Sequence, residues 1–174
     1  SSPDPQLVKE VFSGLSKAAK QSDMAIIGGE TAIVPDLLHK IDSTSFDLVG
    51  MVFGIVNKKS LVLGEKIKEG DVILGVESSG LHSNGYSLAR KVLLSKYKMN
   101  DSTQFIKDSV GDELLRPTRI YVKPINELLN TDRISVHGLA HITGGSFTKL
   151  SRLNKKVNYK LDNLPEPKGV FRLI

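Results

Sequence analysis

The sequence predicts an α/β protein with mixed sheets, and two observations point to this class. Short runs rich in Val, Ile and Phe alternate along the chain with segments whose apolar residues recur at helical spacing. Apolar residues make up 40% and charged residues 25% of the 174 residues, which is the balance of a globular protein. The alternation fits either an α/β or an α+β arrangement of sheets and helices.

The first helix is expected to start at Pro5, because Asp4 can cap it and proline suits the first helical position. Apolar residues then recur at helical spacing, and they are Leu7, Val8, Val11, Phe12, Leu15, Ala18 and Ala19. A second helix is expected just after Gly85, and one of its faces carries Tyr86, Ala89 and Leu93.

Toward the C-terminus the helical signals are shorter. Pro117 is expected to open a helix that Pro124 kinks or restarts, because proline removes a backbone donor. A last short helix is expected over residues 147–153, whereas the polar residues 99–112 predict a loop.

Four apolar runs predict strands, and they cover residues 24–27, 46–56, 72–76 and 135–142. The run 46–56 is long enough for a well-buried strand. The polar residues 57–60 predict a domain boundary, and residues 35–44 predict a loop or a single helical turn.

The composition excludes several classes of protein. The chain has no cysteine, which excludes disulfides, thiol chemistry and cysteine-bound metals. No apolar run reaches the roughly 20 residues that span a bilayer, and the first residues lack a secretory signal, so a cytoplasmic protein without a membrane partner is expected. The net charge is +5, but the lysines are scattered, most densely over 149–160, and do not interleave with aromatic residues. A solvated basic surface is therefore favoured over nucleic-acid binding.

Chemistry is expected where three glycine-bearing segments follow predicted strands. In the first segment, Gly28 and Gly29 allow a tight turn. Glu30 and Thr31 offer hard oxygen atoms that suit Mg²⁺ or the water around a phosphate. The alternative is an ordinary turn with a solvated glutamate.

The second segment lies between a predicted strand and a predicted helix. Its polar side chains and glycines have the composition of an anion-binding loop, and they are Ser78, Ser79, Gly80, His82, Ser83, Asn84 and Gly85. The hydroxyl and amide groups can bind phosphate or sugar, and His82 can titrate near neutrality. Helix capping by Ser83 or Asn84 next to a flexible turn is the alternative.

The third segment leads out of the last predicted strand. In a strand, His137, Leu139 and His141 point to one face. His141 comes last, nearest to a ligand held by the amides of Gly144 and Gly145. Two histidines four residues apart also fit zinc, but no third ligand lies nearby. A hydrogen-bonded core histidine is the preferred interpretation of His137.

Several enzyme classes lack their motifs in this sequence. The chain has no Gly-x-Ser-x-Gly nucleophile elbow, no Walker phosphate-binding loop and no dinucleotide-binding fingerprint. The residues alone therefore favour an α/β protein that binds a small anion or a phosphate ester.

Four segments, in the same order, resemble the phosphoribosylformylglycinamidine cyclo-ligase (AIR synthetase) family. They are Gly28-Gly29-Glu30-Thr31-Ala32 with Pro35, Ser78-Ser79-Gly80-Leu81-His82-Ser83-Asn84-Gly85-Tyr86-Ser87-Leu88, Pro117-Thr118-Arg119-Ile120-Tyr121-Val122-Lys123 and Ala140-His141-Ile142-Thr143-Gly144-Gly145. The resemblance covers nearly the whole chain from about Leu7 onward.

The resemblance implies a two-domain AIR synthetase-like fold and a homodimer formed through the N-terminal sheet. It implies the ATP-dependent ring closure of formylglycinamidine ribonucleotide (FGAM) to aminoimidazole ribonucleotide in purine biosynthesis, with release of ADP and phosphate. ATP and Mg²⁺ are the implied cofactors, and FGAM is the implied small-molecule partner. Ring closure within one bound molecule depends on positioning, and the phosphoryl charge calls for Mg²⁺ and backbone amides rather than a protein nucleophile.

The resemblance also implies roles for individual residues. Glu30, with Thr31, matches a position where related enzymes place an acidic Mg²⁺ ligand, which implies a metal or ATP-phosphate contact. Two segments are implied to line the substrate side, and their residues are Ser78, Ser79, Gly80, His82, Ser83, Asn84, Thr143, Gly144 and Gly145. His141 is the implied candidate for proton transfer or for stabilising an oxyanion.

Two features depart from the family pattern. Ser146 stands where the family usually has a third glycine, so its side chain either narrows the approach of a phosphate or caps a helix. The family's N-terminal glycine-rich loop, its aspartate-bearing ATP segments and its last strands are absent from the chain. The chain is therefore expected to be the middle of the enzyme, with residues 1–59 ending the ATP-binding, dimerising domain and 60–174 beginning the next. It is not expected to catalyse cyclisation alone.

Related ATP-using families are the competing interpretations. They are thiamine-monophosphate kinase, selenophosphate synthetase, a hydrogenase-maturation dehydratase and the larger FGAM synthetase. The Gly-Gly-Glu-Thr and Ser-Gly-Leu-His-Ser-Asn-Gly-Tyr strings favour the cyclo-ligase over them. A non-catalytic nucleotide-binding module is the alternative of a different class.

Overall fold

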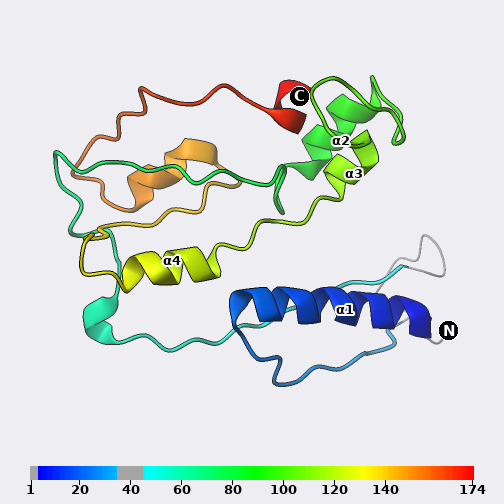
Figure 1. The fold of residues 1–174 in the computed structure, drawn as a ribbon, viewed down its shortest axis with the longest axis horizontal. Helices are drawn as coiled ribbons and strands as arrows, with labels where there is room; N and C mark the ends of the chain where they lie inside the picture. The colour runs from blue at the N-terminus through cyan, green and yellow to red at the C-terminus, as the bar shows by residue number, and fades with distance from the viewer. Residues whose placement is uncertain (1–3, 35–44) are drawn as a thin grey trace. The chain divides into compact units, whose positions relative to one another are not determined.

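A computed structural model of the chain describes residues 4–34 and 45–174 (Figure 1). The chain divides into two compact units. One unit holds the residues up to Leu61 together with Ile120–Asp132, and the other holds Val62–Arg119 with Arg133–Ile174. The predicted loop over 35–44, and Pro35 of the first motif, lie outside the described residues.

The first helix, α1 (Pro5–Ser22), starts where the sequence predicts. The Asp4 carboxylate accepts a hydrogen bond of 2.8 Å from the backbone N–H of Gln6, and Pro5 occupies the first turn. At the other end Asp23 adopts a left-handed conformation with φ 56°, and its N–H caps carbonyl groups of the last turn. The predicted cap and start are confirmed.

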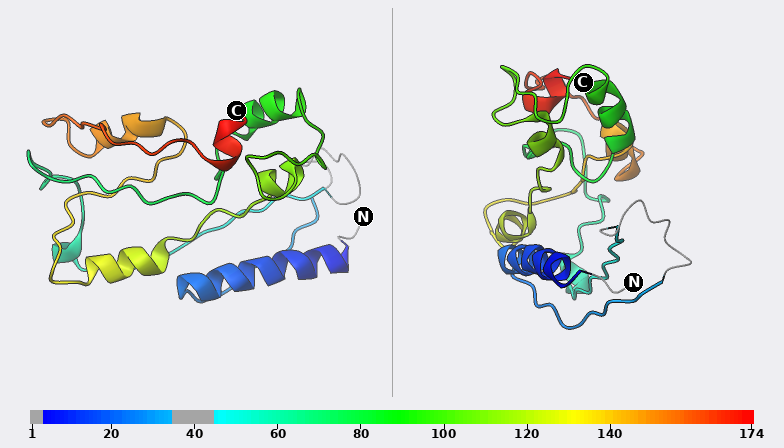
Figure 2. Two further views of the ribbon diagram at one scale, coloured as in Figure 1. Left: turned by 45° about the horizontal axis from the view of Figure 1, so that its top comes forward. Right: turned by 90° about the vertical axis from the view of Figure 1, so that its right-hand side faces the viewer.

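The helix α4 (Val122–Leu129) belongs to the same unit as α1 and contacts it (Figure 2). It begins at Val122 and not at Pro117, so the predicted start is wrong. Pro124 lies in the first turn, where a backbone N–H has no partner within the helix. The proline is therefore accommodated without the predicted kink or restart.

The other unit is built around α2 (Tyr86–Leu94), α3 (Val110–Leu114) and the short 3₁₀ helix η3 (Gly169–Arg172), which lie together in Figure 1. Buried apolar side chains from these helices and the segments next to them form one cluster, which consists of Leu81, Ala89, Leu93, Ile106, Val110, Leu114, Val170 and Leu173. Tyr86 packs against this cluster. The predicted apolar face of the helix after Gly85 is thus confirmed.

The helix α3 begins at the end of the polar stretch 99–112, which the sequence predicts to be a loop. Ser109 and Asp112 form a capping box, in which the Ser109 hydroxyl accepts from the Asp112 N–H at 3.1 Å. The Asp112 carboxylate accepts in return from the Ser109 N–H at 3.3 Å. Val110 is buried in the core, so α3 is stabilised by tertiary packing as well as by its capping box.

The predicted strands are not confirmed. Among the described residues the sheet-like pairing assigned is an isolated antiparallel bridge between Ser102 and Ser109, and the four apolar runs are irregular. The expectation that 46–56 is well buried is wrong here, because Val49 is 97% and Ile55 104% exposed. A strand needs a second segment to pair with its backbone N–H and C=O groups. Val and Ile content gives a run β propensity but does not supply that segment.

Two further 3₁₀ helices are η1 (Lys58–Ser60) and η2 (Ser146–Arg152). The second corresponds to the short helix predicted over 147–153, displaced by one residue. Within 4–34 and 45–174, no helix combines the length and the apolar character that crossing a bilayer requires.

Close contacts fix both ends of the stretch that carries the third glycine segment. A methyl group on Gly64, whose φ is +88°, would lie 2.6 Å from the Leu153 carbonyl oxygen. The side-chain amide nitrogen of Asn154 donates to the Ile67 carbonyl at 3.0 Å. A methyl group on Gly138 would lie 2.6 Å from the Ile67 side chain. The residues between 138 and 153 are therefore anchored at both ends to the turn over 64–67.

Candidate functional site

Two of the sequence-predicted segments meet within the unit that holds α2. The rings of His82 and His141 have centroids 6.0 Å apart and planes tilted by 46°. A methyl group placed on Gly144 would lie 3.8 Å from the side chain of Asn84. The loop before α2 and the loop before η2 are thus neighbours at two points. The structure therefore brings together His82, Asn84, His141 and Gly144.

The segment containing His82 is held by Ser79. The Ser79 hydroxyl donates to the Pro117 carbonyl at 2.8 Å and lies 3.3 Å from Nε2 of His82. The backbone N–H of Ser79 donates to the same Nε2 at 3.4 Å. In the neutral Nδ1–H tautomer, Nε2 is free of a proton and can accept this bond from the Ser79 N–H.

Burial and charge both act on the pKa of His82. Burial of the ring lowers this pKa, and the positive charges of His141 and Arg119 lower it further. The neutral imidazole, which can accept from the Ser79 N–H, is therefore the form favoured around neutral pH. The side chain is half-buried, so a ligand can still reach it.

We expect His82 to titrate below 6.5, the ordinary pKa of histidine, in NMR titrations of its ring nitrogens. The native state favours neutral His82, so this contribution to stability is complete above pH 6.5 and is lost as the pH falls toward the lowered pKa. Arg119→Gln should move the titration of His82 upward, because it removes a positive charge. Arg90→Gln, on the exposed side of α2, is the control and should leave it unchanged. Identical His82 titrations in both variants would contradict the assigned influence of Arg119.

The third segment forms a tight turn ahead of η2. The N–H of Ser146 donates to the Thr143 carbonyl at 2.9 Å, and Gly145 caps η2 with φ +88°, a value that glycine adopts readily. The Thr148 hydroxyl donates to the Gly145 carbonyl. Lys149 reaches back over the turn and donates to the Thr143 hydroxyl oxygen and, at 3.2 Å, to the His141 carbonyl.

Ser146 occupies the position where the family pattern has a third glycine. Its φ is +51°, a left-handed conformation that side chains other than glycine rarely adopt. The interpretation of Ser146 as a helix cap is wrong, because Gly145 is the capping residue and no side chain caps η2. The departure from glycine therefore costs conformational energy.

Ser146→Gly is expected to raise the free energy of unfolding by up to about 1 kcal/mol, because glycine relieves the left-handed strain. Urea denaturation followed by circular dichroism measures the change. The control is Ser151→Gly in the same helix, which should lower stability because Ser151 donates to the Thr148 carbonyl at 2.8 Å and helical glycine is costly. Equal losses in the two variants would show that Ser146 is unstrained.

His137 serves a different purpose from His141. Its Nδ1 lies 2.7 Å from an Asp71 carboxylate oxygen, which confirms the predicted hydrogen bond, although the ring is half-buried and not in the core. This bond, with one from the Lys68 N–H, holds the pKa of Asp71 below its usual value. Among the described residues, no three His, Cys, Asp or Glu side chains are grouped to hold a metal ion.

The remaining predicted site residues are more scattered. Gly80 has φ +143°, and a methyl group on it would lie 3.6 Å from the aliphatic part of Arg116, which bonds to Glu113 at 2.6 Å. Ser78 is half-buried and Ser83 is exposed. Glu30 and Thr31 are exposed and belong to the unit that holds α1.

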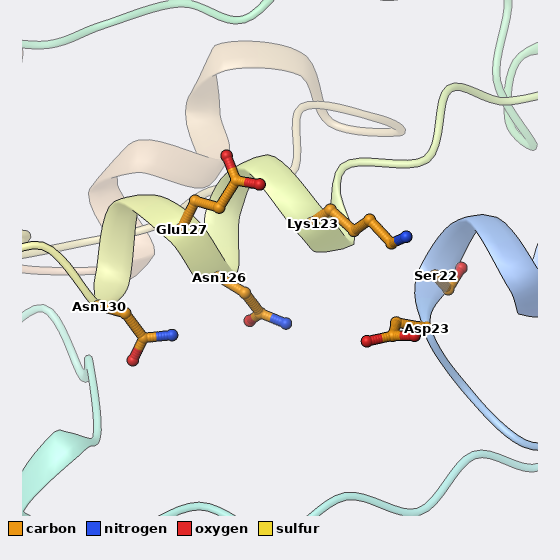
Figure 3. Close-up of a pocket in the computed structure, with 6 residues that line it drawn as sticks. All are labelled: Ser22, Asp23, Lys123, Asn126, Glu127 and Asn130. Carbon is orange, nitrogen blue, oxygen red and sulfur yellow. The ribbon is translucent and has the colours of Figure 1, made fainter.

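An open polar pocket of about 580 Å³ lies in the α1-containing unit (Figure 3). It is lined by Ser22, Asp23, Lys123, Asn126, Glu127 and Asn130. The Lys123 side chain extends from α4 toward the end of α1. The sequence-predicted site residues are not among those that line this pocket.

Sequence reasoning missed three basic residues near the glycine segments. Arg119 acts on His82, and Lys149 binds the turn before η2. A methyl group on Gly145 would lie 4.0 Å from Arg152 Nη2. The stretch 149–160 was expected to be a solvated surface, and for Lys149 this is wrong. The available signal was the short helix predicted after the glycines, which places Lys149 and Arg152 on turns close to them.

The chain matches a known family model over a stretch that includes most of the α2-containing unit and also residues 120–132 of the other unit. The model described as "AIR synthase related protein, C-terminal domain" matches residues 68–168, which is more than half of the chain. The match includes both segments that meet at His82 and His141.

Curated archaeal proteins named phosphoribosylformylglycinamidine cyclo-ligase are similar over nearly the entire chain. The protein from Methanothermobacter thermautotrophicus is 48% identical over 174 residues, covering 99% of this chain and 50% of the relative. That from Methanocaldococcus jannaschii is 50% identical over 171 residues, covering 97% and 47%. That from Pyrococcus furiosus is 46% identical over 172 residues, covering 99% and 48%. The chain spans about half the length of these relatives, and by its family match it belongs to the AIR synthase related proteins, whose fold it is expected to share.

Proposed function

We propose that this chain is part of a phosphoribosylformylglycinamidine cyclo-ligase, which closes the imidazole ring of aminoimidazole ribonucleotide at the expense of ATP. The observation that carries the proposal is the meeting of the His82–Asn84 and His141–Gly145 segments in one unit. Four motif segments resemble the family, and the curated relatives bear this name. The substrate is FGAM, and the other products are ADP and phosphate.

Ring closure needs an activated carbonyl oxygen and a nearby nucleophile on the same molecule. ATP transfers its terminal phosphoryl group to the formyl oxygen of FGAM, and the substrate's amidine nitrogen then attacks the carbon and expels phosphate. The protein's task is to hold the reacting atoms together and to accommodate the moving negative charge. Polar and basic side chains around two glycine turns suit that task better than a nucleophile would.

The phosphate-bearing side of FGAM is assigned to the two meeting segments. Asn84, Thr143 and the amides of Gly144 and Gly145 supply hydrogen-bond donors, while Ser78, Ser79, Gly80, His82 and Ser83 complete the lining. Lys149 and Arg152 bring positive charge to the same turn. His141 is assigned to proton transfer or oxyanion stabilisation, because it is exposed and its ring lies 6.0 Å from that of His82.

ATP and Mg²⁺ are proposed to contact Glu30 and Thr31. Mg²⁺ on a nucleotide takes one or two protein carboxylates and otherwise phosphate and water oxygens, so the single exposed carboxylate of Glu30 fits as one ligand. When bound, Mg²⁺ neutralises phosphate charge. Glu30 and Thr31 would orient the nucleotide complex.

The proposed architecture is the mixed-sheet α/β fold of the family. Residues 1–59 are assigned to the ATP-binding, dimerising domain, and residues 60–174 to the domain that lines the substrate. The exposed apolar runs 46–56 and 72–76 are each proposed to be a strand of its own domain's sheet, and the N-terminal sheet is proposed to form the homodimer.

The proposal is tested by FGAM-dependent release of ADP from the natural protein that carries this chain. ADP and an aminoimidazole product are expected with FGAM, and neither with thiamine monophosphate. Release with thiamine monophosphate alone would move the assignment to the related kinase. ATP binding without turnover of either compound would favour a non-catalytic nucleotide-binding module.

A further inference from the structure

We propose that Lys149 is a positioning residue that aims the Thr143 hydroxyl at the phosphate group of the ligand. The inference rests on the proposed phosphate-ester site and adds to it a residue outside the matched motif segments. It starts from a lysine in a basic stretch that composition alone assigns to solvent. In the structure Lys149 is half-buried and its ammonium group is bound to the turn.

The first step is the direction of the Thr143 hydroxyl. The ammonium group of Lys149 has only donors, so the Thr143 oxygen must accept the bond between them. A hydroxyl that accepts from one side keeps its own hydrogen for a different acceptor. Thr143 is therefore prepared to donate, which is what a phosphate oxygen requires.

The second step is the shape of the turn itself. Lys149 also donates to the His141 carbonyl at 3.2 Å, so one ammonium group bridges His141 and Thr143. With the Ser146 N–H bound to the Thr143 carbonyl at 2.9 Å, the turn is fastened from both sides. Loss of the ammonium group would free Thr143 to rotate and the His141 backbone to move.

The third step is charge. A methyl group on Gly145 would lie 4.0 Å from both Lys149 Cε and Arg152 Nη2, so two cationic side chains border the glycine turn. The chemical class that matches two cations, a fixed hydroxyl donor and a nearby amide side chain is a phosphate monoester dianion. Asn84, 3.8 Å from a methyl group on Gly144, supplies that amide.

The test uses ribose 5-phosphate as the probe, titrated into the full chain by isothermal calorimetry, with neutral ribose as the uncharged comparison. Lys149→Gln should lower the affinity for ribose 5-phosphate by at least about tenfold, because a charge-assisted contact and the orientation of the Thr143 hydroxyl are both lost. Lys149→Arg should restore most of the affinity, since it keeps the charge and the donors. Lys155→Gln, an exposed lysine in the same basic stretch, is the matched control and should bind as the unchanged protein does.

The role through Thr143 has its own readout. If Lys149 acts by aiming that hydroxyl, Lys149→Gln should cost much less in a Thr143→Val background than in the unchanged protein. Independent, additive losses from the two substitutions would overturn the positioning role. In the unchanged protein, the side-chain nitrogen resonance of Lys149 should shift when ribose 5-phosphate is added, while that of Lys155 stays constant. A Lys149 resonance that stays constant would overturn the inference even if Lys149→Gln fails to fold.

Three further results would also overturn the inference. The first is that the unchanged chain does not bind ribose 5-phosphate. The second is that Lys149→Gln and Lys155→Gln bind it with equal affinity. The third is that Lys149→Arg binds it as weakly as Lys149→Gln does. The outcome is separable from the cyclo-ligase assignment. If FGAM-dependent ADP release is absent but Lys149→Gln still weakens ribose 5-phosphate, the reaction assignment fails and the role of Lys149 stands.

Discussion

Leu93→Ala is expected to lower the free energy of unfolding of the α2-containing unit by about 2–5 kcal/mol. Leu93 is 0% exposed and lies in the cluster that joins α2, α3 and η3. Shortening it removes apolar contacts and leaves a cavity whose walls come from three separate stretches of chain. Urea denaturation followed by circular dichroism measures the loss.

The matched control is Leu88→Ala on the same helix. Leu88 is 63% exposed, so its truncation should change stability by no more than about 0.5 kcal/mol. Since both variants gain an alanine in α2, helix propensity affects them alike. Similar losses in the two variants would mean that α2 does not pack as the structure has it.

His141→Asn is expected to lower kcat for FGAM-dependent ADP release by about 10²–10⁴, the usual contribution of a positioned proton-transfer group. Asparagine keeps a polar side chain but cannot exchange a proton near neutral pH. The His141 carbonyl that Lys149 binds is unchanged, so KM should change much less than kcat. Steady-state kinetics of the natural protein gives both values.

His137→Asn is the control for His141. An asparagine amide can take the place of Nδ1 and keep the hydrogen bond to Asp71, which measures 2.7 Å in the structure. His137 binds Asp71 and has no role assigned in the reaction, so kcat should remain close to that of the unchanged protein. A loss as large as that of His141→Asn would argue that both act only on the fold.

The elements that sequence reasoning located are those whose signals are local. Asp4 and Pro5 fix the start of α1 through one hydrogen bond and one constrained φ, both readable from adjacent residues. The apolar face of α2 follows from a period of 3.6 residues. Ser109 and Asp112 are also a local signal for the start of α3, but the polar residues before them favour the prediction of a loop.

The elements that it did not locate depend on distant parts of the chain. Whether 46–56 forms a strand depends on a partner segment that its own Val and Ile content cannot specify. The glycine-bearing segments at Gly28–Gly29, 78–85 and 137–145 are recognisable in the sequence, but their residues alone do not tell which of them meet. The pairing of His137 with Asp71 illustrates the same limit, because nothing local joins a histidine to that aspartate.

The sequence predicts the motif segments of the candidate site, but it does not predict which basic side chains lie beside them. The residues from His82 to Asn84 and from His141 to Gly145 carry the family resemblance and are neighbours in the structure. Lys149 was missed because the direction of a long side chain depends on the backbone geometry of η2, which is 3₁₀ and not α-helical. Arg119 was part of a matched motif, yet its effect on His82 appears only in three dimensions.

The inclusion of η3 in the core has a consequence for how the protein is made. Val170 is 2% exposed and Leu173 7%, and they pack in one cluster with α2 and α3, which are synthesised much earlier. While these late residues are still inside the ribosome, Leu93 and its neighbours on the nascent chain remain without part of their covering. This unit should therefore reach its native packing only after residue 173 has emerged, and until then it is a natural client for chaperones that bind exposed apolar surface.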